Sequence, residues 1–426
     1  MKASIINIGD ELLIGQVQNT NATYMSRALT AAGISVADVC AVGDDGQAIE
    51  AAINRCLGQS DVVLATGGLG PTKDDITKAT LCRMFGSELY ENAEALANIE
   101  RIFAKRGFPM TETNRRQAWV PRCCEMINND LGTAPCMWFD VPASAGAATR
   151  PKALVSLPGV PFEMEYLIDH KILPLLRERF QTGDIVCKNI LVQGIGESFL
   201  SDLLECVEAS MPDGTRLAYL PEAGIIKLRV TATGESGRWP ESDVANTCRQ
   251  IREAAARYIV AEDCESLAEA VAVKMRAAGL TLATAESCTG GQIAARLTAL
   301  PGASDYFRGG VVSYCNEVKH TVLNVSQATL DSHSAVSEAT VGEMADGVRQ
   351  LTGADYAVAT TGVAGPTGGT EQTPVGTVWM ALATPEATFT KKMTYNGRRQ
   401  QVIDRAVNEV LAMLCRHLDA RGNPET

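Results

Sequence analysis

The chain has 426 residues, which is more than a single hydrophobic core usually organises, so we expect two or three domains. Hydrophobic residues make up 46% of the sequence and charged residues 21%, and this balance excludes a disordered chain. The formal net charge of −12 argues against a protein that binds nucleic acid by neutralising its phosphates.

Cysteine usage and hydropathy indicate where the protein works. Thirteen cysteines are scattered without a C-x-x-C pair, and four histidines are too few for a histidine-rich metal site. Reduced thiols of this kind are typical of the cytoplasm. The sequence shows no signal-peptide pattern and no apolar run of the ~18 residues that a membrane span needs. We therefore expect a cytoplasmic protein without membrane contact.

Apolar strands alternate with helices over residues 1–170, which predicts an α/β domain with a parallel sheet. In such sheets, ligands bind beyond the carboxyl ends of the strands. The strands are expected at 3–9, 35–42 and 61–65, and the helices at 21–32 and 48–57.

Glycines and carboxylates follow each of these three strands. The carboxylates are Asp10, Glu11, Asp44, Asp45, Asp74 and Asp75, the last two in the Gly-rich turn TGGLGPTKDDIT. Gathered at one sheet edge they would repel one another unless a cation lay among them, which suggests a divalent ion and a diphosphate. Asp and Gly are also common in ordinary loops and helix caps, and that alternative stays open for each residue alone. Arg115 and Arg116 either meet phosphate oxygens or lie on a solvated helix face.

Residues 171–258 are expected to form a small α+β domain. Gly194 and Gly196 do not by themselves indicate a site, so a spacer or a dimer surface is the expected role. The predicted elements are helices at 171–180, 199–209 and 243–258, a strand at 188–193, a hairpin of strands at 215–220 and 225–233, and a loop at 235–240.

The third predicted domain, residues 259–426, centres on TLATAESCTGG, residues 281–291. There a short strand gives way to a Gly-rich turn and then a helical pattern. The first N–H groups of a helix have no partner within it, and the helix dipole is positive there, so we expect this turn to hold a phosphate beside Ser287. Other strands are expected at 309–314, 356–361 and 377–383. Helices are expected at 268–278, where Ser266 begins a capping box, and after Arg399 to about 418.

Ser287 can act as a nucleophile if a base lies beside it. The histidines of this domain do not follow Gly-rich strand ends, whereas Lys319 follows a neighbouring strand. A lysine serves as a base when burial and nearby groups lower its pKa, and Tyr314 could relay or stabilise the charge. The alternatives are that Ser287 is only a helix cap and Lys319 a surface lysine.

Two further groups of the same domain could hold an anion. Thr361 stands at a third strand end, next to a Gly-rich turn whose N–H groups could bind a phosphate or a developing oxyanion. Arg399 precedes the last helix and could clamp a phosphate.

Long motifs along essentially the whole chain resemble the competence- and damage-inducible protein A (CinA) family. They are GDELLIGQVQNTN (9–21), TGGLGPTKDDIT (66–77), LPGVPFEM (157–164), ESCTGG (286–291), SYCNEVK (313–319) and TTGVAGPTGG (360–369) with the following PVGTV. The resemblance implies an α/β protein of three domains: a molybdopterin-binding-like domain (1–170), a KH-type α+β domain (171–258) and a carboxy-terminal amidase domain (259–426).

The same resemblance implies two activities. The last domain would hydrolyse nicotinamide mononucleotide to nicotinate mononucleotide and ammonia, without a cofactor. The first domain would use a divalent metal ion to cleave ADP-ribose to AMP and ribose 5-phosphate. The family further suggests a homodimer whose partners are these small nucleotides, with nucleic acid disfavoured because Gly194-Ile-Gly-Glu is acidic.

Carried over motif by motif, the resemblance implies roles for individual residues. The catalytic residues would be Ser287, Tyr314, Lys319 and Thr361. The substrate would be bound by Thr289, Gly290, Gly291, Asn316, Gly362, Gly365 and Arg399 in the last domain and by Gly67, Gly68 and Gly70 in the first. The metal ligands would be Asp10, Asp44 and Asp75.

The sequence departs from the family pattern at four positions. Cys136 replaces the last Gly of a GTAPG pattern, which puts a ligand-side turn and the amino-terminal activity in doubt. Ser334 replaces the Gly of GAVS, Arg398 the acidic residue of a GDR motif, and Thr373 a Lys before PVG. Two other functions stay open: a nucleotide- or pterin-binding regulatory protein with an inactive amino-terminal site, and molybdenum-cofactor synthesis, which rests on fold analogy alone.

Overall fold

The computed structural model describes residues 1–72, 74–141, 152–180, 184–234 and 240–422. The loop expected at 235–240 falls mainly outside these ranges. Contacts divide the chain into two compact units, Met1–Val186 with Ala232–Glu241 and Cys187–Thr231 with Ser242–Thr426. Within the described ranges, no helix combines the length and apolar character that crossing a membrane requires.

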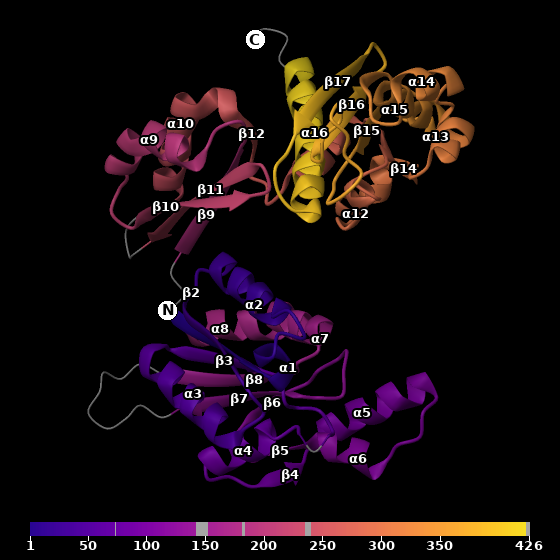
Figure 1. Ribbon diagram of the computed structural model, residues 1–426. Helices are drawn as coiled ribbons and strands as arrows, with labels where there is room; N and C mark the ends of the chain where they lie inside the picture. Colours follow the sequence, from indigo (N-terminus) through magenta and orange to yellow (C-terminus); the bar gives the residue numbers. More distant parts are fainter. Residues whose placement is uncertain (73, 142–151, 181–183, 235–239, 423–426) are drawn as a thin grey trace. The chain divides into compact units, whose positions relative to one another are not determined.

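The amino-terminal unit is built on a six-stranded sheet in the order β2-β1-β3-β8-β7-β6 (Figure 1). The first four strands are parallel, as predicted, whereas β7 runs antiparallel to both its neighbours, so the sheet is mixed. The strands are β1 (Lys2–Ile8), β2 (Ser35–Val42), β3 (Val62–Thr66), β6 (Glu125–Ile127), β7 (Cys136–Val141) and β8 (Lys152–Leu157).

Helices cover both faces of this sheet because its central strands are apolar on both sides. Ile5 packs with α2, α7 and α8 on one face, and its neighbour Ile6 packs with α3 and α4 on the other. These helices are α2 (Thr20–Ala31), α3 (Gly46–Gln59), α4 (Thr77–Met84), α7 (Pro161–Leu167), and α8 (Leu173–Arg179), the last two joined by a π-helical turn (Ile168–Ile172).

Short elements complete this unit. A helical turn, α1, follows β1 directly, and the segment between α4 and β6 forms a small lobe with its own two-stranded sheet. They are α1 (Asp10–Leu13), β4 (Leu89–Glu91), α5 (Ala93–Arg106), α6 (Glu112–Arg115), a 3-10 turn (Arg116–Ala118) and β5 (Trp119–Pro121).

The second unit begins with the α+β domain, which starts later than the predicted residue 171, because the helix expected at 171–180 is α8 and packs on the sheet of the amino-terminal unit. The sheet of this α+β domain has the order β10-β11-β9-β12, and the expected hairpin forms with Gly224 at a φ of +77° in the turn. The elements are β9 (Asp184–Val192), α9 (Glu197–Ala209), β10 (Thr215–Glu222), β11 (Ile225–Gly234), α10 (Pro240–Ala255), a 3-10 turn (Ala256–Tyr258) and β12 (Ile259–Glu262).

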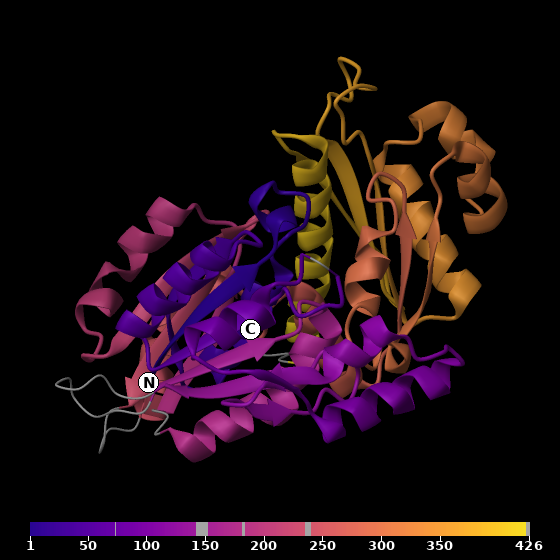
Figure 2. The same ribbon diagram turned by 90° about the horizontal axis from the view of Figure 1, so that it is seen from below.

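The rest of this unit is a five-stranded sheet in the order β14-β13-β15-β16-β17, with β14, β13 and β15 parallel and β16 and β17 antiparallel. Helix α16 lies against one face with α11 and α12, and α15 covers the other, as Figures 1 and 2 show. The strands are β13 (Leu282–Glu286), β14 (Phe307–Val312), β15 (Tyr356–Gly362), β16 (Thr377–Ala383) and β17 (Thr388–Thr394).

Helix caps in this domain follow the sequence. Ser266 accepts a hydrogen bond from Glu269 N–H, which begins α11 where the capping box predicted it. Ser337 caps α15 in the same way. The helices are α11 (Leu267–Ala278), α12 (Gln292–Thr298), a 3-10 turn (Ala303–Asp305), α13 (Asn316–Leu323), α14 (Gln327–His333), α15 (Glu338–Thr352) and α16 (Arg399–Gly422).

Candidate active sites

Ser287 and Lys319 meet at the carboxyl ends of β13 and β14. Ser287 directly follows β13, and its N–H donates to Thr360 O in the neighbouring β15 at 2.9 Å. Lys319 lies in the first turns of α13, which follows β14. Lys319 Nζ donates to Ser287 Oγ at 3.0 Å and to Ser313 O at 2.6 Å. The parallel strands therefore place an amine directly beside a serine hydroxyl.

This lysine is unusually placed for a cation. Its side chain is 1% exposed and Ser287 is 9% exposed, and burial lowers the pKa of Lys319 below its ordinary value. A lysine that loses its proton more readily can accept one from a serine. The alternative of a surface lysine is wrong for Lys319.

A buried carboxylate holds the Gly-rich turn in place. Glu286, 1% exposed, accepts hydrogen bonds from Gly291 N–H and Ile293 N–H at 3.0 Å, from Ala294 N–H at 2.9 Å and from Thr289 Oγ1 at 2.7 Å. We expected the first N–H groups of this helix to be without partners and to hold a phosphate. That expectation is wrong, because the Glu286 carboxylate already satisfies them.

Eight of the predicted residues line one cavity of about 280 Å³, which we name the amidase pocket after the activity that the family resemblance implies. Thr289, Gly290 and Gly291 do not line it. Thr289 is buried behind the serine, where its hydroxyl contacts Glu286 and Thr360. The eight predicted residues of the amidase pocket are Ser287, Tyr314, Asn316, Lys319, Thr361, Gly362, Gly365 and Arg399.

Arg399 and Tyr314 meet at the rim of the amidase pocket. Arg399 donates to Gly365 O at 2.8 Å and to the Tyr314 hydroxyl at 2.7 Å, and Tyr314 is 62% exposed. The guanidinium is thus held in place, at the start of α16, where an anionic group of a ligand could reach it. Thr361 has a different environment, since its hydroxyl donates to Ala335 O at 2.7 Å and ties down the loop before α15.

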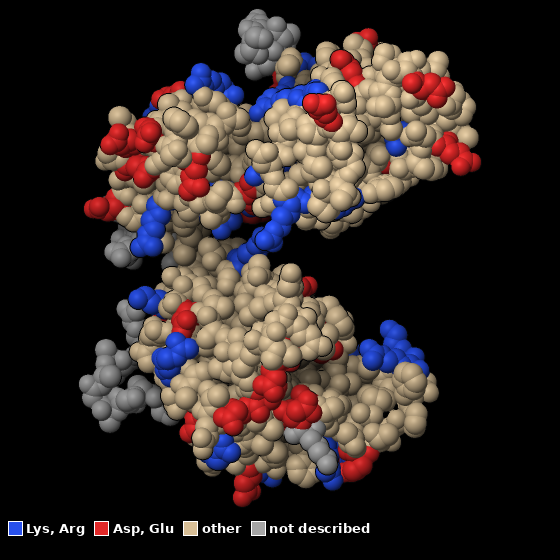
Figure 3. All heavy atoms as spheres, viewed as in Figure 1, with Lys and Arg blue, Asp and Glu red and all other residues tan. Residues whose placement is uncertain are grey.

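The amino-terminal unit has a second cavity, of about 400 Å³, at the carboxyl ends of β1, β2 and β3. We name it the carboxylate pocket, because Glu11, Asp44, Asp74 and Asp75 line it together with the turn Gly67–Gly70. Figure 3 shows acidic side chains gathered on this unit near α1. The three strand ends therefore converge as the sequence predicted.

The predicted metal trio does not converge as a set of ligands. Asp10 and Asp44 face each other, each accepting a hydrogen bond from the other's backbone N–H at 3.1 and 3.2 Å, and Asp10 does not line the pocket. Asp75 accepts from Gly70 N–H and Thr72 N–H, both at 2.8 Å, and from the Thr72 hydroxyl. Asp75 thus holds the Gly-rich turn in place. The three carboxylates do not surround a single ion site in this arrangement.

Electrostatic repulsion remains around Asp44. Burial and the neighbouring carboxylates of Asp10, Glu11 and Asp74 raise its pKa, against the lowering effect of the hydrogen bond from Asp10 N–H. Mg²⁺ in proteins is usually held by one or two carboxylates together with substrate phosphates. The residues present fit that kind of ion at Asp44, and they do not fit an ion enclosed by Asp10, Asp44 and Asp75.

Two asparagines of the carboxylate pocket escaped the sequence analysis. Asn7, at the end of β1, and Asn21, in α2, each have a buried side-chain oxygen without a hydrogen-bond partner among the described residues. The amide of Asn21 donates to Gly159 O at 2.8 Å, so its orientation is fixed. Their positions in the sequence could have indicated these two residues. Asn7 falls within a predicted strand, and Asn21 is the last residue of the motif GDELLIGQVQNTN.

Cys136 lies away from the carboxylate pocket. It is the first residue of β7 and fully buried, and burial raises the pKa of its thiol. We expected Cys136 to lie in a turn beside the ligand. It lies instead in the core of the amino-terminal unit.

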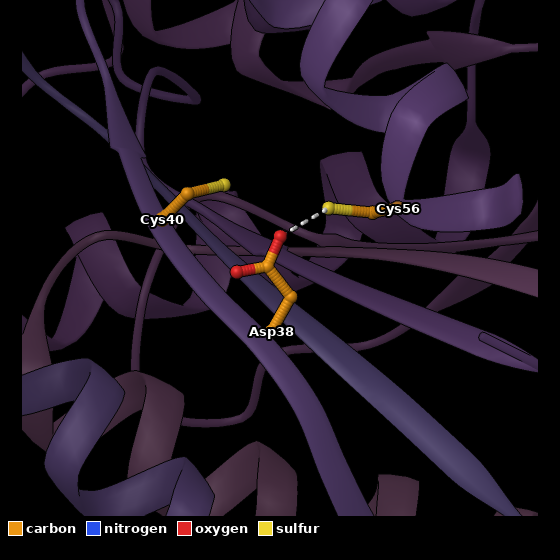
Figure 4. Close-up of side chains that lie close together, drawn as sticks. All are labelled: Asp38, Cys40 and Cys56. Carbon is orange, nitrogen blue, oxygen red and sulfur yellow. Dashed lines mark hydrogen bonds between the residues drawn. The ribbon is translucent and has the colours of Figure 1, made fainter. Parts of the chain in front are cut away.

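Two cysteines lie beside a carboxylate elsewhere in this unit: Asp38 and Cys40 are on β2, and Cys56 is on α3. The ligand atoms of Asp38, Cys40 and Cys56 lie within 4.8 Å of one another, the one such group of three found in the described residues (Figure 4). The Asp38 carboxylate already accepts from Arg55 at 2.5 Å and from Gln59 at 3.1 Å. We assign no metal to this group, because its carboxylate is satisfied by the protein.

The sequence was compared with known families and proteins. The model of the probable molybdopterin binding domain matches residues 4–178, that of the damage-inducible protein CinA KH domain residues 187–261, and that of the CinA C-terminal domain residues 264–418. These three matches coincide with the three folded regions described above.

Individual relatives cover nearly the whole chain. A CinA-like protein of Flavobacterium psychrophilum is 39% identical over 422 residues, 98% of this chain and 99% of that protein. A putative competence-damage inducible protein of Caldanaerobacter subterraneus is 38% identical over 422 residues, 99% of each chain. A crystal structure of the competence damage-inducible protein A (ComA) from Klebsiella pneumoniae is 46% identical and covers 36% of this chain and 95% of that one, with a TM-score of 0.35. From the identity over nearly its full length, this chain belongs to the CinA family.

Proposed function

We propose that the carboxy-terminal domain is an amidase that hydrolyses nicotinamide mononucleotide to nicotinate mononucleotide and ammonia. The observation that supports it most is the 3.0 Å contact between Lys319 Nζ and Ser287 Oγ in a buried site. A serine paired with a lysine of lowered pKa is a nucleophile with its own base. Arg399 at the rim suits the phosphate of a mononucleotide, whose ring would then point toward Ser287.

In this proposal Ser287 Oγ attacks the carboxamide carbon while its proton passes to neutral Lys319 Nζ. The protonated lysine then gives that proton to the departing nitrogen, the C–N bond breaks, and ammonia leaves an ester on Ser287. Water, losing a proton to Lys319, hydrolyses the ester and restores the serine hydroxyl. Ser287 N–H is bonded to Thr360 O, so it is not the donor that stabilises the oxyanion.

The test is ammonia release from nicotinamide mononucleotide by the full chain. We expect Ser287→Ala to lower kcat by ~10³-fold or more, since covalent catalysis is then lost. Ser326→Ala, which changes an exposed serine that caps α14, is the matched control and should keep normal turnover. Near-normal turnover by a folded Ser287→Ala variant would reject the serine assignment. No turnover by the unaltered chain would favour a nucleotide-binding regulatory protein.

The carboxylate pocket favours a second proposal, metal-dependent cleavage of ADP-ribose to AMP and ribose 5-phosphate. Its support is the combination of a Gly-rich turn, four carboxylates and the two unpaired asparagine oxygens in one 400 Å³ cavity. A divalent ion there would neutralise diphosphate charge and polarise a phosphoryl oxygen. Asp44 is the residue best placed to help hold it, and Asn7 and Asn21 would accept hydrogen bonds from ribose hydroxyls.

AMP release from ADP-ribose with Mg²⁺ tests this second proposal. We expect Asp44→Asn to lower it by roughly tenfold or more, the effect of weakening a metal site, while ammonia release from nicotinamide mononucleotide stays unchanged in the same sample. Equal AMP release by the variant would remove Asp44 from the site. We also propose a homodimer, which light scattering would detect as twice the mass of the 45.3 kDa chain.

A further inference from the structure

A cavity of about 550 Å³ lies in the second unit where the four-stranded sheet meets the carboxy-terminal domain. We name it the seam pocket. One wall is the segment Gln193–Glu197 with the hairpin turn at Gly224, and the other comes from β17 and α16. It shares no lining residue with the amidase pocket. Its volume falls within the range of about 300–1,000 Å³ that small-molecule sites have.

Hydrogen-bonding groups in the seam pocket are left unused. Gln193 is 6% exposed, and its Nε2 donates to Glu409 Oε2 at 2.9 Å, which fixes the amide. Its Oε1 is buried and has no partner among the described residues, and the same is true of the Tyr395 hydroxyl. Burying such atoms unpaired is unfavourable, so a ligand that brings an N–H donor and an acceptor would be stabilised here.

The α16 wall of this pocket carries positive charge. Glu409 is neutralised by Lys391, whose Nζ donates to it at 2.6 Å. Arg405 donates to the backbone carbonyl of Asn396, and Arg416 has no hydrogen-bond or ion-pair partner within the part of the chain that the structure describes. Guanidinium groups of this kind bind phosphate.

The opposite wall is mainly apolar. Ile195 and Ile226 line it, and with Met393 of β17 they offer apolar surface for a planar ring. Two carboxylates also face the cavity: Glu222 is paired with Lys227 at 3.1 Å, and Glu197 begins α9. An anion is therefore favoured beside the arginines of α16, and a ring with N–H groups is favoured beside Ile195 and Gln193.

We propose that the seam pocket is an effector site for a nucleoside monophosphate with an amino group on its base. The phosphate contacts Arg416, the base packs on Ile195 and Met393, and its amino group donates to Gln193 Oε1.

Backbone contacts connect this pocket to the amidase pocket. Tyr395 N–H donates to Gly376 O at 2.9 Å, and Gly376 N–H donates to Val363 O at 2.7 Å, where Val363 lines the amidase pocket. Helix α16 also begins with Arg399 of the amidase pocket and continues through Arg405 to Arg416. A ligand that holds α16 and Tyr395 thus acts on the residue proposed to bind the substrate phosphate, and we infer that occupancy changes KM for nicotinamide mononucleotide.

The test uses AMP and the full chain. Equilibrium dialysis should detect AMP binding, and Arg416→Ala should weaken one class of bound AMP by at least about tenfold, the loss expected for a charge-assisted phosphate contact. AMP should change KM for nicotinamide mononucleotide by about fivefold, a typical coupling between sites, and this response should disappear in Arg416→Ala. Tyr395→Phe, which removes only an unpaired hydroxyl, should weaken the same AMP class.

Arg249→Ala is the matched control, because Arg249 lies on α10 outside the seam pocket and pairs with Glu253. It should keep both AMP binding and the KM response. If AMP only competed with the substrate at the amidase pocket, its effect on KM would persist in Arg416→Ala. An effect of AMP on KM that this substitution leaves unchanged therefore overturns the proposal. Binding of AMP that does not change KM overturns the effector role, and no loss of bound AMP in either pocket variant overturns the site. Binding is measured without turnover, so its outcome is independent of the amidase proposal.

Discussion

The amidase pocket and the carboxylate pocket stand at equivalent places, the carboxyl ends of parallel strands, yet they differ in how complete they are. In the amidase pocket, Ser287 and Lys319 are buried and already hydrogen-bonded to each other. In the carboxylate pocket, Asp44 accepts from Asp10 N–H, and Asp75 accepts from Gly70 N–H and Thr72 N–H in its own turn, while Asp10 beside the pocket accepts from Asp44 N–H. The groups proposed to react in the first site are therefore in contact with each other, whereas the carboxylates of the second contact backbone N–H groups.

Burial explains the difference. Lys319 is deep enough for desolvation to lower its pKa, as the role of a base that we propose for it requires. Asp44 is only partly buried, and repulsion from its neighbours helps to raise its pKa, which a cation would relieve. The carboxyl edge of a parallel sheet can therefore carry a buried, hydrogen-bonded pair of side chains or a group of partly exposed carboxylates. The difference lies in how far the surrounding loops bury the side chains.

The largest effect is expected from Lys319→Met, which keeps the length of the side chain and removes the base. Ammonia release should fall by ~10³-fold, within the range that general bases contribute. Steady-state kinetics of the full chain measures it, and Lys392→Met on β17 is the exposed control. A variant that keeps more than a tenth of the activity would contradict the assigned base.

The same lysine should govern the pH dependence. Because the neutral amine is the proposed active form, kcat/KM should rise as the pH increases through the pKa of Lys319, which burial lowers from the ordinary value of 10.5. The folded state binds fewer protons than the unfolded state in that window, so the free energy of unfolding should rise with pH there too. A pH profile that is flat between neutral pH and 10 would contradict this prediction.

Glu286→Ala should be the next largest in effect. It leaves one buried and two partly buried N–H groups and the buried Thr289 hydroxyl without their acceptor, so the free energy of unfolding should fall by about 3 kcal/mol. Denaturant unfolding measures it, with Glu317→Ala on the exposed first turn of α13 as control. Equal stability of the two variants would show that solvent replaces the Glu286 carboxylate.

Asp75→Ala should weaken the carboxylate pocket alone. Without this acceptor the turn from Gly70 to Thr72 loses its hydrogen bonds, so AMP release from ADP-ribose should fall by roughly 10- to 100-fold through misplacement of the turn. Asp75→Asn, which keeps one oxygen acceptor, should lose less. Ammonia release should not change in either variant, and unchanged ADP-ribose cleavage in Asp75→Ala would contradict a role for this turn.

Periodicity and spacing predicted much of this fold. The strand at 35–42 is β2 residue for residue, and the predicted strand ends bring Ser287, Lys319 and Thr361 into one pocket. The antiparallel strand β17 was not predicted, because Lys391-Lys392 interrupts the alternation of polar and apolar residues in TFTKKMT and glycines do not mark its ends.

The hydrogen-bond partners of individual polar groups could not be predicted from the sequence. Glu286 and Asp75 look like ligands in a motif, but folding turns both carboxylates onto neighbouring N–H groups. Local competition of this kind cannot be decided from residue types, since an N–H group donates to a phosphate or to a carboxylate equally well. The unpaired oxygens of Asn7 and Gln193 likewise emerge only when the surrounding chain is in place.

The smallest predicted effect concerns Ser334, where the family pattern has glycine. Ser334 has φ +66° and ψ 171°, a region that residues with a Cβ rarely adopt, and its carbonyl accepts from Ser337 and Thr340 beside the loop that Thr361 holds. Because strain of this kind costs about 1–3 kcal/mol and glycine gains entropy in the unfolded chain, Ser334→Gly should raise the free energy of unfolding by about 1 kcal/mol. Ser326→Gly, at an ordinary φ of −66°, should instead lower it by a few tenths of a kcal/mol. If denaturant unfolding gives both substitutions the same sign, the contact of 3.4 Å between Ser334 Oγ and Val336 N–H outweighs the strain, and the amidase pocket then owes part of its order to a serine that replaces glycine.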